Sequence, residues 1–187
     1  MGKLILVLGG ARSGKSTHAQ KLAREMAANS GLVAYVGTGV ACDDEMRARF
    51  EKHRHSRPPQ WATIEAPTEV PQVIQRMGRE YTVMIVDCLT TLLTNWLAEM
   101  GQLEEPGENM AGLEEAILGR VKELVQATRE TQAAVIVVSN EVGLGIVPAF
   151  KAGRVFRDLA GLANQVIARE ADEVYMMWAG IPHKIKG

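Results

Sequence analysis

Residues 9–16 are the segment of this sequence with the clearest chemistry. They read GGARSGKS, which fits the pattern G-x-x-x-x-G-K-[ST] that wraps nucleotide phosphates. Glycines let the backbone turn closely around an anion, and the amides that begin the following helix point toward it. The segment predicts a purine nucleoside triphosphate site, with Lys15 bridging the β- and γ-phosphates and Ser16 bound to Mg²⁺. Its residues are Gly9, Gly10, Ala11, Arg12, Ser13, Gly14, Lys15 and Ser16.

An acidic residue, Asp87, closes the apolar run at residues 83–86. A carboxylate at the end of a buried strand can lie beside the phosphate loop and bind magnesium directly or through water. The same carboxylate could instead cap the helix expected from Thr90 onward, and the two roles are compatible. We predict Ser16 and Asp87 as the Mg²⁺ ligands.

A histidine, His53, lies in a segment of helical periodicity at residues 43–55. The segment is acidic at its start and basic at its end, as the helix dipole favours. His53 shares one face with Met46 and Phe50, so it could be a hydrogen-bonded histidine at the edge of the core. Beside arginines and a bound triphosphate, a neutral imidazole could instead attack phosphorus. The residues alone leave both interpretations open.

The elements that must position these residues alternate along the chain. Short runs rich in Val, Ile and Leu predict strands at residues 4–8, 32–36, 83–86, 135–138 and 174–177, with a weaker strand at 61–66. Helical periodicity predicts helices at residues 15–28, 43–55, 68–79, 90–100, 110–131 and 149–171. This alternation predicts an α/β fold of the P-loop NTPase type (RecA-like), with a mostly parallel sheet and helices on both faces.

The helix predicted at residues 149–171 has a polar side with mid-helix Gly161 and Asn164, which are costly on an ordinary wet face. This side is expected to line a substrate cleft or a subunit interface, although a solvated face remains an alternative. Asn140 and Glu141 end the strand before it and are expected at the ligand-binding edge of the sheet. The polar side contains Arg154, Arg157, Asp158, Gly161, Asn164 and Gln165, and Val155, Leu159, Leu162, Ala163 and Val166 lie opposite.

Composition limits the class of protein. The chain has 187 residues, of which 47% are apolar and 23% charged, and this predicts a single domain over residues 1–187. The formal net charge of −1 gives no general attraction to nucleic acid or anionic lipid. No apolar run is long enough to span a bilayer. Cys42 and Cys88 show no paired spacing, which favours free thiols and a cytoplasmic protein.

Several motifs in order resemble one family. They are the phosphate loop, residues 43–46 (DDEM), His53 followed by Arg57-Pro58, Thr90-Thr91 with Asn95, residues 140–148 (NEVGLGIVP) and residues 156–165 (FRDLAGLANQ). Over residues 4–186 the chain resembles the bifunctional adenosylcobinamide kinase/adenosylcobinamide-phosphate guanylyltransferases of cobalamin biosynthesis. The resemblance implies phosphorylation of adenosylcobinamide by ATP or GTP. It further implies transfer of GMP from GTP to adenosylcobinamide phosphate, with release of pyrophosphate.

The resemblance also implies site residues and partners. His53 matches the family's guanylylated histidine, whereas His55 falls at a variable position, and Lys15 would absorb the charge of the leaving pyrophosphate. The family is a ring-like trimer, so a homo-oligomer is expected, and the implied ligands are Mg²⁺, GTP, ATP, adenosylcobinamide and its phosphate, with no nucleic acid. Besides residues 9–16, the implied GTP site contains Gly37, Thr38, Gly39, Arg54, His55, Ser56, Arg57, Glu65 and Asp87.

Two other functions are compatible with the phosphate loop alone. In a plain small-molecule kinase, His53 would be structural. A RecA-like ATPase that drives partner assembly would need a partner-binding patch, and the sequence shows no basic surface to supply one. Covalent labelling of His53 by GTP would separate these functions from guanylyl transfer.

Overall fold

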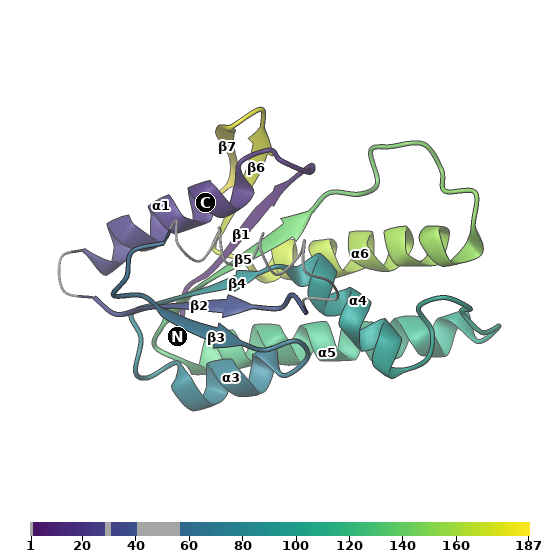
Figure 1. Cartoon of the computed structure of the whole chain (residues 1–187), viewed down its shortest axis with the longest axis horizontal. Helices are drawn as coiled ribbons and strands as arrows, with labels where there is room; N and C mark the ends of the chain where they lie inside the picture. The colour runs from purple at the N-terminus through teal and green to yellow at the C-terminus, as the bar shows by residue number, and fades with distance from the viewer. Residues whose placement is uncertain (1, 29–30, 41–56) are drawn as a thin grey trace.

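The computed structural model describes residues 2–28, 31–40 and 57–187, and it is shown in Figure 1. The strands are β1 (Leu4–Gly9), β2 (Val33–Gly37), β3 (Ala62–Glu65), β4 (Val83–Asp87), β5 (Ala134–Asn140), β6 (Glu173–Trp178) and β7 (Ile181–Lys186). The helices are α1 (Lys15–Ala27), α3 (Val70–Met77), α4 (Leu89–Glu99), α5 (Met110–Glu130) and α6 (Lys151–Glu170). The helix predicted at residues 43–55 lies outside the described residues.

The strands form one sheet in the order β3-β2-β4-β5-β1-β6-β7. Every neighbouring pair is parallel except β6 and β7. Only β5 separates β1 from β4, so the ends of these two strands lie about 10 Å apart at the same edge of the sheet. This strand order brings the phosphate loop and Asp87 to one edge.

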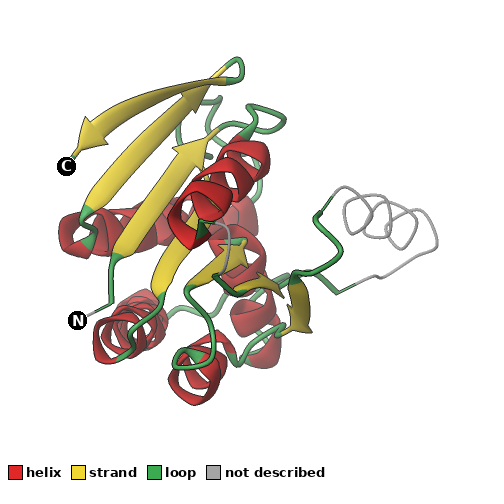
Figure 2. Ribbon diagram, turned by 90° about the vertical axis from the view of Figure 1, so that its left-hand side faces the viewer, coloured by secondary structure: helices red, strands yellow, loops and turns green. Residues whose placement is uncertain are grey.

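Helices cover both faces of this sheet, as the alternating strand pattern predicts. Leu4, Leu6 and Leu8 of β1 face one core with α3, α4, α5 and α6, whereas Ile5 and Val7 face the other core with α1. The two layers are visible in Figure 1, where α1 lies above the sheet and α3 and α5 lie below it, and in the turned view of Figure 2. The predicted α/β fold is confirmed.

Most predicted strands end too early at the carboxyl side. The structure extends β1 to Gly9, β2 to Gly37, β4 to Asp87 and β5 to Asn140. These last residues are glycine or polar, so an apolar run does not include them, yet their backbones still pair with neighbouring strands. The residues that end the strands are therefore those of the ligand-binding edge.

The antiparallel strand β7 is absent from the sequence prediction. Ala179 and Gly180, with φ of 49° and 86°, form a two-residue turn that pairs Trp178 with Ile181. Positive φ at both central residues is typical of a tight hairpin turn, and the Ala-Gly pair was the available signal. All residues of β7 are exposed, so the strand lacks the apolar alternation that marks a half-buried strand.

The polar side predicted for the last helix is wrong at Asn164. This side chain is buried on α6, where its Oδ1 accepts a hydrogen bond from Ser139 at 2.7 Å and its Nδ2 donates to the Asn140 carbonyl at 3.3 Å. Asn164 is tolerated in mid-helix because the polar end of β5 provides its partners. No helix within residues 2–28, 31–40 and 57–187 combines the length and apolar character needed to cross a membrane.

Candidate nucleotide site

The phosphate loop connects β1 to α1 and depends on two glycines. Gly9 has φ of 152°, and a Cβ there would lie 2.6 Å from Ser13 Oγ and 2.7 Å from the Met177 carbonyl oxygen. Gly14 precedes α1 with φ of 92°, a left-handed conformation that glycine adopts at little cost. Because α1 begins directly at Lys15, its amino end and partial positive charge point toward the space that the loop encloses.

Lys15 is the buried cation of this loop. Its side chain is only 8% exposed, and its Nζ donates a hydrogen bond to the Gly10 carbonyl oxygen at 2.6 Å. Burial lowers the pKa of Lys15, and the negative charge of Asp87 opposes part of that shift. The ammonium group and the Asp87 carboxylate therefore lie close enough to interact, and Ser16 follows Lys15 in the first helical turn.

Asp87 is held from the neighbouring strand. The Tyr35 hydroxyl of β2 donates to Asp87 Oδ2 at 2.6 Å, and the backbone amide of Thr38 donates to the Asp87 carbonyl oxygen at 3.1 Å. The cap position of α4 belongs to Cys88, and no side chain caps that helix. The Asp87 carboxylate is thus turned toward β2 rather than toward the start of α4.

Thr38 fastens the loop after β2 to the loop after β4. Its hydroxyl accepts from the Cys88 amide at 2.8 Å and donates to the Cys88 carbonyl oxygen at 2.9 Å. The Asn95 amide of α4 donates to the carbonyl oxygens of Thr38 and Pro67, both at 2.8 Å. The Thr38 side chain, amide and carbonyl group are therefore all hydrogen-bonded within the protein, which fixes the loop after β2 against the loop after β4.

A second polar cluster holds the end of β5. Asn140 donates to the Thr90 hydroxyl at 2.8 Å, and the Glu141 amide donates to the Gly9 carbonyl oxygen at 3.0 Å. These bonds join β5 to α4 on one side and to the phosphate loop on the other. Asn140 and Glu141 thus lie at the ligand-binding edge, as the sequence predicts.

Glu65 and Arg57 lie toward the far end of the same edge. The Cα of Glu65 pairs with that of Gly37, and strand spacing puts Glu65 about 10 Å from Asp87 and about 19 Å from Gly9. The Arg57 guanidinium carbon lies 3.2 Å from the centroid of the Tyr35 ring, and its Nη1 donates to the Thr63 hydroxyl at 3.4 Å. Four predicted site residues, His53, Arg54, His55 and Ser56, lie outside the described residues.

Sequence reasoning missed Tyr35 and the structural roles of Thr38 and Asn95. Tyr35 appears in the sequence as one more apolar residue of a buried strand, because nothing in the run marks its hydroxyl as a partner of Asp87. A polar group within an otherwise apolar strand is the one signal that could have pointed to it, since such groups need partners when buried.

The donor set fits a magnesium ion that is shared with phosphates. Ser16 offers a hydroxyl oxygen and Asp87 a carboxylate oxygen, and Mg²⁺ prefers such oxygen ligands, with phosphates and water completing its coordination. Within the described ranges no group of three or more His, Cys, Asp or Glu side chains could hold a metal.

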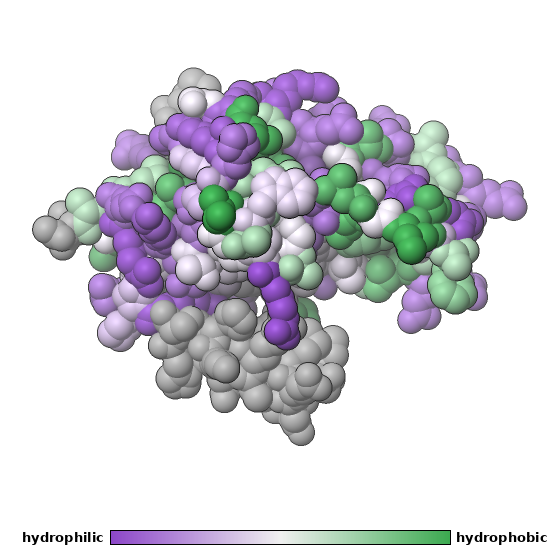
Figure 3. All heavy atoms as spheres, turned by 90° about the horizontal axis from the view of Figure 1, so that it is seen from above, coloured by the Kyte–Doolittle hydropathy of each residue, from purple (hydrophilic) through white to green (hydrophobic). Residues whose placement is uncertain are grey.

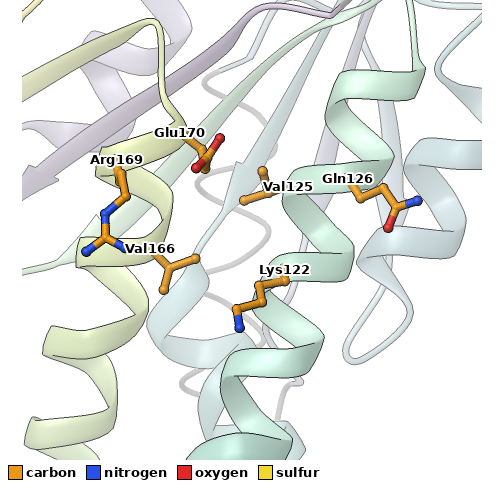
Figure 4. Close-up of a pocket in the computed structure, with 6 residues that line it drawn as sticks. All are labelled: Lys122, Val125, Gln126, Val166, Arg169 and Glu170. Carbon is orange, nitrogen blue, oxygen red and sulfur yellow. The ribbon is translucent and has the colours of Figure 1, made fainter.

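Grooves lie at both ends of the α5–α6 pair, and the one between their first turns is lined by Met110, Glu114, Lys151, Arg154, Val155, Asp158, Leu159 and Leu162. A groove between α5 and α6 is lined by the six residues labelled in Figure 4, among them Lys122 and Arg169. They come from the last turns of both helices, which lead into the amino ends of β5 and β6, so the groove lies at the opposite edge of the sheet. Exposed hydrophobic side chains are frequent in the loop that follows β5, where they are Val142, Leu144, Ile146, Val147 and Phe150. Figure 3 shows hydrophobic and hydrophilic side chains side by side on one face of the molecule.

Comparison with known proteins identifies relatives over nearly the whole chain. The family model described as cobinamide kinase / cobinamide phosphate guanyltransferase matches residues 5–185. The chain is 41% identical over 184 residues to the bifunctional adenosylcobalamin biosynthesis protein CobU of Escherichia coli, covering 98% of this chain and 99% of that protein. It is 39% identical to the corresponding CobP protein of Pseudomonas aeruginosa, covering 97% of this chain and 96% of that protein.

Two solved structures share the fold at low identity. The flagellar accessory protein FlaH of Methanocaldococcus jannaschii superposes with a TM-score of 0.51 and 16% identity over 99% of this chain and 78% of that chain. The second structure is an ATPase domain, which superposes with a TM-score of 0.55 and 15% identity over 94% of this chain and 69% of that chain. These likenesses support the predicted RecA-like architecture, whereas the sequence matches carry the family. The chain belongs to the cobinamide kinase / cobinamide phosphate guanyltransferase family.

Proposed function

We propose that this chain catalyses two successive transfers to one corrinoid. It phosphorylates adenosylcobinamide with a nucleoside triphosphate, and it then transfers GMP from GTP to adenosylcobinamide phosphate. The products of the second transfer are adenosylcobinamide-GDP and pyrophosphate. The observation that carries this proposal is a family match over residues 5–185 in a chain whose phosphate loop, Lys15 and Asp87 share one sheet edge.

In the kinase step the phosphate loop holds the triphosphate for direct attack. A hydroxyl oxygen of adenosylcobinamide attacks the γ-phosphorus, the bond from that phosphorus to the β–γ bridging oxygen breaks, and the nucleoside diphosphate leaves with that oxygen. The hydroxyl proton is released as the new ester forms. Lys15 and the amide groups at the start of α1 stabilise the charge that builds on the phosphate oxygens.

In the guanylyl step His53 acts as a nucleophile. A neutral ring nitrogen attacks the α-phosphorus of GTP, the bond to the α–β bridging oxygen breaks, and pyrophosphate leaves while the ring loses its proton. A phosphate oxygen of adenosylcobinamide phosphate then attacks the same phosphorus, and the P–N bond breaks as the ring takes a proton back from solvent, which restores the neutral imidazole. Two displacements let the nucleotide and the bulky corrinoid occupy the site in turn.

Ser16 and Asp87 would hold the magnesium ion that accompanies the nucleotide. The ion, when bound, supplies positive charge that neutralises the phosphate oxygens during transfer. Asp87 is suited to this role because the Tyr35 hydroxyl fixes one of its oxygens at the sheet edge. Lys15 supplies a second positive charge within the phosphate loop.

The remaining implied residues are assigned to the sugar and base end of GTP. Glu65, about 19 Å from Gly9 across the sheet edge, is too far for phosphate contact and suits hydrogen bonding to the nucleoside. The backbone of Gly37, Thr38 and Gly39 lies between these ends. The family resemblance also assigns to the GTP site Arg54, His55, Ser56 and Arg57. On the same ground we propose that the protein is a cytoplasmic homo-oligomer that does not bind nucleic acid.

Product analysis with two labels tests the proposal. With adenosylcobinamide and ATP or GTP labelled at the γ-phosphate, label should move to the corrinoid. With adenosylcobinamide phosphate and α-labelled GTP, label should also move to the corrinoid, with one pyrophosphate released per transfer, whereas α-labelled ATP serves as the control and should transfer none.

Each rival function has its own outcome in the same assay. Transfer of the γ-label without any transfer of the α-label contradicts the guanylyl step and leaves a plain kinase. Hydrolysis of nucleotide without label on the corrinoid contradicts both steps and leaves an ATPase.

A further inference from the structure

Tyr35 joins two parts of the candidate site. It lies on β2, is only 7% exposed, and its Cα pairs with that of Ile85, two residues before Asp87 on β4. Alternate residues of a strand face the same side, so Tyr35 and Asp87 share one face of the sheet. The Tyr35 hydroxyl donates to Asp87 Oδ2 at 2.6 Å. Fixing one oxygen restricts the rotation of the whole carboxylate.

The face of the Tyr35 ring holds an arginine from a different part of the chain. The Arg57 guanidinium carbon lies 3.2 Å from the ring centroid, well inside the range of a cation–π contact. Arg57 is the fourth residue after His53 in the sequence. Arg57 also donates from its Nη1 to the Thr63 hydroxyl of β3 at 3.4 Å, so it is held beside β2 and β3.

We propose that Tyr35 is a positioning residue for guanylyl transfer. Its hydroxyl orients Asp87 toward the magnesium nucleotide, and its ring holds Arg57, which the proposed function assigns to GTP, near the same carboxylate. This inference rests on the proposed function, in which Asp87 binds the metal and His53 accepts GMP. One buried side chain would thus link the proposed metal ligand to an arginine of the proposed GTP site.

The hydroxyl is tested by Tyr35→Phe, which removes one oxygen and keeps the ring. The Mg²⁺ concentration that half-saturates binding of a fluorescent GTP analogue should rise about five- to tenfold, because an unrestrained carboxylate must be ordered when the metal binds. At saturating Mg²⁺, the rate of covalent labelling by α-labelled GTP should stay near that of the wild type, because Arg57 keeps its ring.

Tyr175→Phe is the matched control for this variant. The Tyr175 hydroxyl of β6 donates to Glu173 Oε2 at 2.6 Å, so the substitution removes an equally short tyrosine–carboxylate bond from the same sheet. It should change stability without changing the Mg²⁺ dependence. Equal Mg²⁺ dependence in Tyr35→Phe and wild type overturns the proposed coupling to Asp87.

The ring is tested by Tyr35→Leu, Arg57→Met and the double variant. Each single substitution should slow covalent labelling at saturating Mg²⁺ and GTP by about tenfold, and the double variant should be little slower than either, because partners in contact are not additive. Circular dichroism confirms that each variant is folded. Single effects that multiply in the double variant overturn the ring–arginine link.

The controls separate this inference from the proposed function. A wild-type protein that binds GTP but takes no covalent label contradicts the guanylyl step itself. The Mg²⁺ titration of analogue binding needs no covalent step, so it still decides whether Tyr35 acts through Asp87. If Arg57→Met unfolds the protein, Arg57→Lys keeps a cation above the ring and should retain most of the labelling rate.

Discussion

The ammonium group of Lys15 lies 2.6 Å from the carbonyl oxygen of Gly10 in the phosphate loop. In this position it has one backbone partner and the nearby charge of Asp87. A triphosphate would offer it stronger acceptors, because hydrogen bonds between charged groups are shorter and stronger than neutral ones. Lys15 is therefore the residue whose loss should weaken nucleotide binding most directly.

We predict that Lys15→Met weakens GTP binding by about 10- to 100-fold, which corresponds to the loss of one or two charged hydrogen bonds. Isothermal titration calorimetry measures the change. Lys21→Met is the matched control, since Lys21 lies on the same helix and pairs only loosely with Glu25 at 3.9 Å. Equal affinity of Lys15→Met and wild type would contradict the predicted phosphate contact.

For single residues, the sequence predicts a site within one loop better than it predicts contacts between residues that lie far apart in the chain. Residues 9–16 are recognisable because their spacing is fixed within one loop. Thr38 and Cys88 are 50 residues apart, and Asn95 reaches back 57 residues to the Thr38 carbonyl oxygen. These hydrogen bonds arise only once β2 and β4 become neighbours, and a single sequence does not state the strand order. The predictions for residues 53–56 stay predictions.

The β6–β7 hairpin supports the phosphate loop from outside the site. Its turn residue Gly180 donates its backbone amide to the Ser13 carbonyl oxygen at 3.0 Å. A Cβ added to Gly14 would lie 3.3 Å from the Gly180 Cα, so the turn and the loop are in close contact. A substitution in this turn should therefore displace the phosphate loop and weaken nucleotide binding.

We predict that Gly180→Ala lowers the free energy of unfolding by about 1 kcal/mol, because its φ of 86° is costly for a residue with a Cβ. It should also weaken GTP binding measurably. The neighbouring Ala179→Gly is the control, since it relieves a positive φ of 49° and should leave stability unchanged or slightly raised. Urea denaturation measures the free energy of unfolding, and GTP titration measures the affinity. Unchanged GTP affinity in Gly180→Ala would contradict the claim that the β6–β7 hairpin supports the phosphate loop.

The start of β6 contributes a pH-dependent part of stability. A hydrogen bond from Lys3, with further bonds from Tyr175 and Lys184, lowers the pKa of Glu173 from 4.5 to about 2. A depressed carboxyl pKa stabilises the folded state above pH 4.5, and this contribution is lost as the pH falls toward 2.

We predict that Glu173→Gln lowers the free energy of unfolding at pH 7 by about 1 to 2 kcal/mol, after allowance for screening of the exposed lysines. Urea denaturation from pH 7 to pH 2 should show the difference from wild type shrinking below pH 4.5. Glu25→Gln is the control, because its exposed pair with Lys21 should contribute almost nothing. A difference that stays constant down to pH 2 would contradict the depressed pKa.

Elements were predicted best where an apolar pattern is long and one-sided. Six strands and the helices of the described residues lie where the pattern puts them, with ends shifted by one or two residues in most cases. The final strand, β7, is exposed on every residue, so burial left no pattern in its sequence. Asn164 was assigned to the wrong side of α6 because its partners, Ser139 and Asn140, come from another element.

One sheet with a core on each face makes cooperative unfolding the expected behaviour of the whole molecule. We predict that tryptophan fluorescence, to which the buried Trp96 contributes together with Trp61 and Trp178, and far-ultraviolet circular dichroism give the same urea midpoint. Saturation with Mg²⁺ and GTP at about 100 times Kd should raise the free energy of unfolding by about 2.7 kcal/mol. Two separate midpoints would contradict the predicted single domain.

The central claim is that GTP held by the phosphate loop guanylylates His53. The most direct measurement is mass spectrometry of the protein after incubation with GTP and Mg²⁺ at neutral pH, followed by peptide mapping under alkaline conditions that preserve a P–N bond. We predict the added mass of one GMP, carried by the peptide at His53, absent from His53→Ala and present in His55→Ala. A protein that hydrolyses or binds GTP without this added mass, or that carries it on His55, would contradict the claim.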